Sequence, residues 1–174
     1  MRTVAYDLDG TLFSIKQCIE LFNQRTNKKY SLKDIEQYSF GYLYGLSPEE
    51  YLETWLSISE EVIIKSEVNE KMLQNLRLEK EQGSRILIVT ARDKKLERLS
   101  EESLIKHNIH YDGIYSGSED KYDTLKKENV SRFFDDRGEL IHRLMQTDLE
   151  KSCELTIVDA PYNKNFQSHS RFIL

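Results

Sequence analysis

The sequence predicts an α/β protein with an open parallel sheet and a small α-helical cap inserted after the first strand. Short apolar segments alternate with helical patterns over residues 76–174, as they do in parallel sheets. The segment 85–90 (RILIVT) is nearly continuously apolar, which is typical of a parallel strand covered on both faces. Residues 14–75 instead show several helix patterns and no clear strand. We therefore expect a core at 1–13 and 76–174 and a helical cap at 14–75.

The composition is that of an ordinary globular protein. The 174 residues carry a formal net charge of −5, so the sequence offers no broad basic surface for duplex nucleic acid. Cys18 and Cys153 lie far apart and match no metal-ligand spacing, and we expect both to be reduced. The first strand begins within a few residues of the start, and no apolar run has the length of a membrane span. These features predict a cytoplasmic protein.

The first strand, expected at Thr3–Tyr6, ends in two carboxylates that are one residue apart. Burying Asp7 and Asp9 beside each other is costly unless a cation, a phosphate or both lie between them. Gly10 permits a tight turn out of the sheet and lets backbone N–H groups approach an anion. Asp-Gly is also a common hairpin signal, but a hairpin does not require the second acid. The segment 7–11 (DLDGT) therefore predicts a metal or phosphate site.

Capping signals define the expected helices of the cap. Ser14 can cap a helix that runs to about Arg25, and the segment 31–34 (SLKD) resembles a capping box that opens a short helix. The segment 47–50 (SPEE) is a strong helix start, with a cap, a proline and then an acid in the third position. A further helix is expected over about 69–82, and the glycine that follows it should end it.

Aromatic side chains alternate in the segment 38–45 (YSFGYLYG) of the cap. One interpretation is that Phe40 and Tyr44 pack inside the cap. The other is that they form an aromatic wall that stacks on a planar base, because rings with a polar tip suit a half-wet pocket. The sequence alone leaves both interpretations open.

Several strands of the core are expected to end in polar residues. The strand at 85–90 ends in Thr90, and a strand at 131–134 runs into Asp135 and Asp136. The other expected elements are helices at about 94–107, 121–128 and through 140–144, and strands at about 113–115 and 155–158. In open parallel sheets, ligands bind outside the carboxyl ends of the strands. Asp7, Thr90 and Asp136 can therefore share one pocket.

Four segments resemble, in the right order, the motifs of the haloacid dehalogenase-like (HAD) phosphatase superfamily. The segment 7–12 (DLDGTL) resembles the first motif, and 89–92 (VTAR), where a threonine ends a hydrophobic strand, resembles the second. The segment 133–137 (FFDDR) resembles the fourth. The third motif is a lysine at the start of the helix before that strand, where Lys121 stands, with the lysines at 126–127 as alternatives. The resemblance implies a Rossmann-like core of the HAD-like fold.

The same resemblance implies a Mg²⁺ site. Asp7 and Asp136 would supply side-chain oxygens and Asp9 its backbone carbonyl, since Mg²⁺ prefers oxygen ligands. The position of the strand end favours Asp136 over Asp135 as the direct ligand, and Asp135 would then hold the lysine. Which of the two carboxylates binds the metal directly stays open at this point.

The resemblance also implies covalent catalysis by a carboxylate. Asp7 would attack phosphorus and form an aspartyl-phosphate, while Asp9 would give a proton to the leaving oxygen and later take one from water. Thr90 and Lys121 would hold the phosphoryl oxygens. Arg92 is either a surface arginine at a helix start or a second contact to phosphate or sugar.

Within the superfamily, the chain most resembles the 5′-nucleotidase and 5′(3′)-deoxyribonucleotidase branch. The resemblance rests on the small size, the early helical cap, the Asp-Asp-Arg ending and the segment 159–163 (DAPYN). It implies hydrolysis of (deoxy)nucleoside monophosphates, with Phe40, Tyr42, Tyr44 and Trp55 as candidates to enclose the nucleoside. The expected partner is thus a small-molecule phosphomonoester, and a homodimer stays open. The alternatives are a polynucleotide 3′-phosphatase, a sugar phosphatase and a catalytically silent nucleotide-binding protein.

Overall fold

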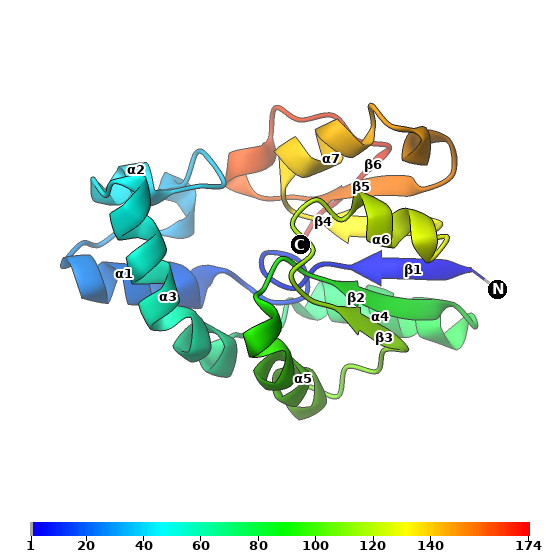
Figure 1. Ribbon diagram of the computed structural model, residues 1–174, viewed down its shortest axis with the longest axis horizontal. Coiled ribbons are helices and arrows are strands. Elements are labelled where there is room, and N and C mark those ends of the chain that lie inside the picture. The colour runs from blue at the N-terminus through cyan, green and yellow to red at the C-terminus, as the bar shows by residue number, and fades with distance from the viewer. Residues whose placement is uncertain (1) are drawn as a thin grey trace.

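The computed structural model describes residues 2–174 and contains one sheet of six parallel strands (Figure 1). The strands are β1 (Thr3–Tyr6), β2 (Arg85–Val89), β3 (Gly113–Tyr115), β4 (Arg132–Asp135), β5 (Glu154–Val158) and β6 (Ser170–Phe172). Their order in the sheet is β3-β2-β1-β4-β5-β6. The predicted open parallel sheet is therefore confirmed.

The strand order places the start of the chain at the centre of the sheet. From β1 the chain moves outward through β2 and β3, then crosses back to β4 on the other side of β1. β1 is hydrogen-bonded in parallel to both β2 and β4, with Ala5 opposite Leu87 and Phe133. This reversal creates a crevice at the carboxyl ends of β1 and β4, which is where open α/β sheets bind their ligands.

Successive side chains of the central strand enter two different hydrophobic clusters. Val4 and Tyr6 pack with residues of the helices α4 (Glu70–Glu81) and α5 (Glu97–Lys106). Ala5 packs with residues of α6 (Tyr122–Lys127) and α7 (Gly138–Leu144). This alternation is the period of two of a β-strand. Because both faces are covered, the central strands are apolar on both sides, as the sequence predicted.

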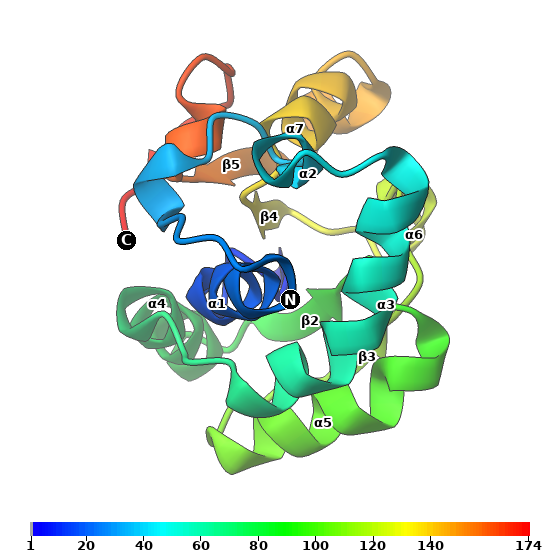
Figure 2. The ribbon, with the colours of Figure 1, turned by 90° about the vertical axis from the view of Figure 1, so that its left-hand side faces the viewer.

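Three helices stand apart from the sheet, at its carboxyl edge: α1 (Lys16–Thr26), α2 (Gly41–Tyr44) and α3 (Pro48–Lys65) (Figures 1 and 2). We call residues 16–65 the lobe. Its interior is a separate cluster that includes Phe22, Phe40, Tyr44, Ile58 and Val62. α3 begins as predicted, since Ser47 Oγ accepts from the N–H of Glu50 and the Glu50 carboxylate accepts from the N–H of Ser47.

The fourth helix packs on the sheet. Met72, Leu73 and Leu76 of α4 are buried in the same cluster as Val4 and Tyr6. The boundary predicted at residue 75 therefore falls inside α4, and the packing favours a division near the end of α3.

Two short elements differ from the sequence expectation. β6 was not predicted, because its sequence, Ser-Arg-Phe, has no apolar run, and as an edge strand it pairs only with β5. The aromatic segment also contains one helical turn, α2, which ends at Gly45 with φ +69°. Within residues 2–174, none of the helices combines length with enough apolar character to cross a membrane.

Candidate active site

The tight loop after β1 carries Asp7 and Asp9 at the centre of the carboxyl edge of the sheet. The N–H of Asp7 continues the pairing of β1 with β4 by donating to the carbonyl of Phe134 at 3.0 Å. Gly10 then takes φ +82°, and a Cβ at this position would collide with the carboxylate of Asp136. Glycine is required here both by the backbone angle and by the close approach of the two loops. The loop therefore brings the ends of β1 and β4 into contact.

Lys121 lies between two of the carboxylates at this edge. Its Nζ donates to Asp7 Oδ1 at 2.5 Å and to Asp135 Oδ2 at 2.7 Å. The lysine side chain is fully buried and also lies over the ring of Phe133. By contrast, Lys126 is exposed and pairs with Asp148 on the surface. Of these two lysines, Lys121 is therefore the one that contacts the carboxylates at the strand ends.

The backbone of Lys121 is held in the left-handed region, with φ +62°. For a residue with a side chain, this conformation costs roughly 1–2 kcal/mol. Such strain is kept where the surrounding contacts determine the position of the residue. Here those contacts are the two buried carboxylates that Lys121 joins.

Burial and charge shift the pKa values of these groups in a consistent way. Burial raises the pKa of Asp7 to about 7, although the ammonium group of Lys121 opposes this. For Lys121, burial works against the charged form, but Asp135 and Asp7 outweigh it and the pKa lies above its usual value. The pKa of Asp136 is raised well above its usual value by burial and by the nearby charges of Asp135 and Asp7. The site therefore favours an additional positive charge.

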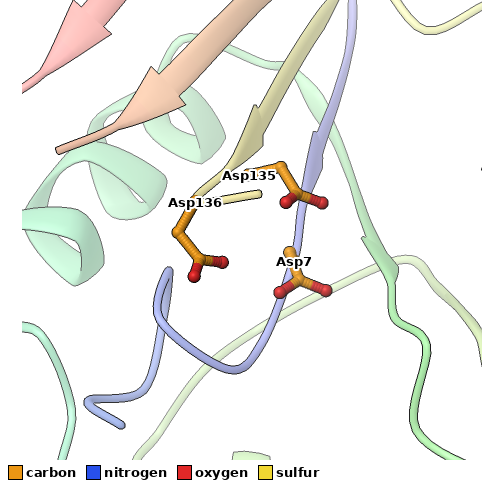
Figure 3. A group of neighbouring side chains, drawn as sticks. All are labelled: Asp7, Asp135 and Asp136. Atoms are coloured by element: carbon orange, nitrogen blue, oxygen red, sulfur yellow. The ribbon is translucent and has the colours of Figure 1, made fainter. Parts of the chain in front are cut away.

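Asp7, Asp135 and Asp136 form an acidic cluster that fits a metal ion. One carboxylate oxygen from each lies within 4.8 Å of the others, and Figure 3 shows the three side chains gathered at the ends of β1 and β4. Asp136 Oδ1 is buried and, among residues 2–174, has no hydrogen-bond partner. Leaving a buried carboxylate oxygen without a partner is costly. Clustered oxygen ligands with one unpaired buried oxygen are the donor set that Mg²⁺ prefers.

The two acids at the end of β4 have different surroundings. Asp135 accepts from Lys121 and from the N–H of Arg137 at 2.8 Å. Asp136 instead accepts, through Oδ2, from the hydroxyl of Tyr162. Since the unpaired oxygen belongs to Asp136, this geometry agrees with the prediction that Asp136 is the direct ligand and Asp135 holds the lysine.

Arg92 pairs with Asp9. Its guanidinium donates to both carboxylate oxygens of Asp9, each at 2.7 Å, and also to Ser100 Oγ at 3.1 Å. Arg92 is only 6% exposed, so the interpretation as a surface arginine is wrong. Thr90 is also buried, and its Oγ1 accepts from the N–H of Arg92. The pair leaves the side chain of Asp9 outside the acidic cluster, so only its backbone carbonyl stays a candidate metal ligand.

A cavity of about 310 Å³ lies between the ends of the strands and the lobe. At the strand ends it is lined by Asp7, Asp9, Thr90 and Arg92, and we call these residues, together with the buried Lys121, Asp135 and Asp136, the floor. The lobe, with the preceding Ile15, contributes mostly apolar and aromatic side chains: Tyr38, Phe40, Tyr51, Leu52, Trp55, Leu56, Val62 and Ile63. The cavity therefore combines a few charged groups with apolar and aromatic walls, as small-molecule sites commonly do.

The structure separates the two aromatic residues that the sequence grouped as substrate contacts. Phe40 lines the cavity, although it is largely buried against Phe22. Tyr44 lies inside the lobe, where its hydroxyl bonds to the carbonyl of Ile19 at 3.3 Å and to Asn23 at 3.1 Å. Tyr44 is therefore not among the residues that line the cavity, contrary to what is expected of a substrate contact, because the helical turn of α2 points its ring toward α1.

Other residues join the site without having been predicted there. Tyr162 hydrogen-bonds to Asp136 across 26 residues of sequence. Arg137 and Glu119 line the cavity and are joined by an ion pair of 2.9 Å. The sequence did mark the segments 133–137 and 159–163 by resemblance. It carried no signal for the direction of these side chains, since the contacts depend on the order of β4 and β5 in the sheet.

Curated bacterial nucleotidases are similar to most of this chain, whereas no protein-family profile matches it. The protein named "Putative nucleotidase YqfW" from Bacillus subtilis is 28% identical over 166 residues, which cover 94% of this chain and 83% of that protein. "Nucleotidase CA_C3379" from Clostridium acetobutylicum is 25% identical over 162 residues, or 92% of this chain and 82% of that one.

Solved structures share the fold at low sequence identity. A predicted phosphatase from Clostridium acetobutylicum matches with a TM-score of 0.65 at 16% identity, over 98% of this chain and 93% of that one. A HAD-superfamily hydrolase from Geobacter sulfurreducens matches with a TM-score of 0.55 at 13% identity, over 98% and 91%. A chain of the Pnkp1/Rnl/Hen1 complex matches with a TM-score of 0.53 at 19% identity, and this chain spans only 44% of its length.

These findings agree with the site. The solved structures show the fold alone at such identities, and that fold is the one found in HAD-like hydrolases. The sequence relatives carry the name nucleotidase, and the acidic cluster of this chain fits a metal-dependent site.

Proposed function

We propose that the protein hydrolyses (deoxy)nucleoside monophosphates with Mg²⁺, through an aspartyl-phosphate formed on Asp7. The observation that carries this proposal is the acidic cluster, in which Asp7 lies against Lys121 at the charged end of a cavity. Phosphoryl transfer depends mainly on positioning and on charge stabilisation. A carboxylate beside a lysine and a metal-binding group of oxygens supplies both.

In the first step, Asp7 attacks phosphorus and the bond to the leaving ester oxygen breaks. Asp9, on the same loop, gives its proton to that oxygen and later accepts a proton from the water that hydrolyses the aspartyl-phosphate. When bound, Mg²⁺ supplies positive charge that offsets the repulsion between the phosphate and the carboxylates. Lys121 adds a second positive charge beside Asp7.

Arg92 orients Asp9 for both transfers. Its guanidinium donates to both carboxylate oxygens of Asp9, and these two hydrogen bonds restrict the direction of the carboxylate. Asp9 therefore depends on Arg92 for its position.

The lobe supports a nucleotide as the substrate. Trp55, Phe40 and Tyr51 give the cavity an aromatic end opposite the acidic cluster. Aromatic rings bind bases by stacking, which is worth about 1–3 kcal/mol per base. The names of the sequence relatives, nucleotidases, point to the same class of substrate.

The test is phosphate release from nucleoside monophosphates, sugar phosphates and 3′-phosphorylated oligonucleotides, with Mg²⁺ and with EDTA. We expect release from nucleoside monophosphates that requires Mg²⁺ and falls below detection in Asp7→Asn. The matched control is Asp93→Asn, because Asp93 also lines the cavity but its carboxylate only caps the N–H of Lys95. This variant should keep most of the activity.

Other outcomes would select an alternative. Release confined to sugar phosphates or to oligonucleotide ends would keep the mechanism and replace the substrate. Nucleotide binding without release, in folded protein supplied with Mg²⁺, would indicate a catalytically silent binding protein.

A further inference from the structure

Tyr162 lies in the turn after β5 and contacts the acidic cluster. It is only 5% exposed, and its hydroxyl donates to Asp136 Oδ2. The other oxygen of the same carboxylate, Oδ1, is the buried one without a hydrogen-bond partner among residues 2–174. One oxygen of Asp136 is therefore held by the protein, while the second is left for a cation.

The turn that carries Tyr162 is fixed to the end of β4. Asn163 donates through Nδ2 to the backbone carbonyl of Asp136 at 2.7 Å and to that of Val158 at 2.8 Å. Its Oδ1 accepts from the N–H of Ala160 at 3.1 Å. Both the backbone and the side chain of Asp136 are thus held from the 160–163 turn. Such contacts to a metal ligand fix its orientation.

The ring of Tyr162 also contacts the lobe. Tyr38, which precedes α2, packs edge-to-face against Tyr162 with ring centroids 6.1 Å apart. The guanidinium of Arg137, the residue after Asp136, lies 4.9 Å from the centre of the Tyr38 ring. Tyr38 of the lobe therefore contacts both Tyr162, which hydrogen-bonds to Asp136, and Arg137, which follows Asp136 in sequence. These contacts connect the lobe to the Asp136 carboxylate.

We propose that Tyr162 is a positioning residue for Asp136 as a metal ligand, and that Tyr38 makes this positioning depend on the placement of the lobe. Tyr162 keeps Oδ1 directed toward the acidic cluster by holding Oδ2. The packing of Tyr38 of the lobe on Tyr162 favours the orientation of Asp136 that binds metal. The inference rests on the metal requirement in the proposed function.

The test is calorimetric titration of metal-free protein with Mg²⁺, without substrate. Tyr162→Phe removes the hydroxyl and keeps the ring that packs on Tyr38, so we expect Mg²⁺ affinity to fall about 10–100-fold. The melting temperature of the metal-free protein should stay close to that of the wild type. Tyr44→Phe is the matched control, because it removes a hydroxyl that bonds inside the lobe. This control should bind Mg²⁺ like the wild type.

Tyr38 gives a second, independent readout. Tyr38→Leu should weaken Mg²⁺ binding severalfold, whereas Tyr38→Phe, which keeps the ring, should not. In a Tyr162→Phe background, Tyr38→Leu should cause little further loss, because residues that act through one contact are not additive. Full additivity would overturn the role of Tyr38.

The outcomes separate this inference from the proposed function. Wild-type protein that does not bind Mg²⁺ overturns both. Wild-type protein that binds Mg²⁺ while Tyr162→Phe binds it equally well overturns the inference alone.

A spectroscopic measurement on the wild-type protein tests the inference even if a variant does not fold. Mg²⁺ should change its near-ultraviolet tyrosine absorbance, since the Tyr162 phenol bonds to a ligand, and an unchanged spectrum would contradict the inference.

Discussion

The floor and the lobe lie on either side of one cavity, and each is held together internally by a different kind of interaction. The floor joins residues that are far apart in sequence, such as Lys121 and Asp7, through charged groups that are almost completely buried. The lobe is one continuous insertion whose interior consists of apolar and aromatic contacts. Buried charges tolerate little change in geometry, whereas an apolar surface can change its shape by substitution. Under the proposed function, we therefore expect the floor to fix the chemistry and the lobe to select the substrate.

The largest effect is expected at Lys121, where a change to the floor affects both stability and activity. Lys121→Met leaves Asp7 and Asp135 buried without their cation. The free energy of unfolding should fall by about 3–5 kcal/mol, and phosphate release should be lost. Chemical denaturation and the phosphate assay measure the two effects.

Lys126→Met is the control for this substitution, because Lys126 pairs with Asp148 on the surface. Loss of such an exposed pair should cost less than about 1 kcal/mol and leave activity intact. Equal effects of the two substitutions would contradict the assignment of Lys121 as the lysine that supports Asp7.

At Asp9 the expected effect is on chemistry. Asp9→Asn should lower kcat for a nucleoside monophosphate by about 10²–10⁴-fold, since proton transfer to the leaving group is lost. The loss should be smaller for p-nitrophenyl phosphate, whose leaving group departs without protonation. The ratio of the two rates, compared with that of the wild type, is the measurement. An equal loss with both substrates would show that Asp9 acts in another way.

A substitution in the lobe should change substrate binding and spare the chemistry. Trp55→Ala removes an aromatic wall of the cavity. Loss of about 1–3 kcal/mol of stacking corresponds to a rise of roughly 5–150-fold in KM for nucleotides. The kcat for p-nitrophenyl phosphate should stay near that of the wild type. The control Tyr44→Phe, which changes a residue inside the lobe, should leave both KM and kcat unchanged. If Trp55→Ala also lowered kcat for p-nitrophenyl phosphate, the floor and the lobe would not have separate roles.

The pH dependence of stability should differ between wild type and Asp7→Asn when metal is removed with EDTA. Because burial raises the pKa of Asp7 to about 7, folded protein binds this proton more tightly than unfolded protein. The resulting stabilisation is complete below the unfolded pKa of roughly 3.9 and is lost as the pH rises toward 7. Between these values, wild-type stability should fall relative to Asp7→Asn by up to about 1.4 kcal/mol per pH unit.

Chemical denaturation at several pH values measures this difference. Added Mg²⁺ should reverse the trend near pH 7, because it favours the ionised carboxylate. Parallel pH profiles of the two proteins without metal would contradict the raised pKa.

The sequence by itself determined the elements that carry the chemistry. Apolar runs predicted the central strands, and the acids at the ends of β1 and β4 followed directly from their positions in those runs. Capping residues predicted the start of α3 correctly, because the signal lies within four adjacent residues. Local periodicity and capping are properties of the chain itself, so they can be read without the fold.

The tertiary structure decided which of those residues meet. The hydrogen bond of Lys121 to Asp7 spans 114 residues, and it requires β4 to lie beside β1 in the sheet. Within the same segment, Lys121 precedes the first turn of α6 and reaches the acids, whereas Lys126 lies in the last turn and pairs on the surface. The tertiary structure likewise decided the pairing of Arg92 with Asp9 and the contact of Tyr162 with Asp136. The direction of the Tyr44 ring, by contrast, depended on a single helical turn. Long-range pairing arises from the packing of the whole chain, which no local sequence pattern encodes.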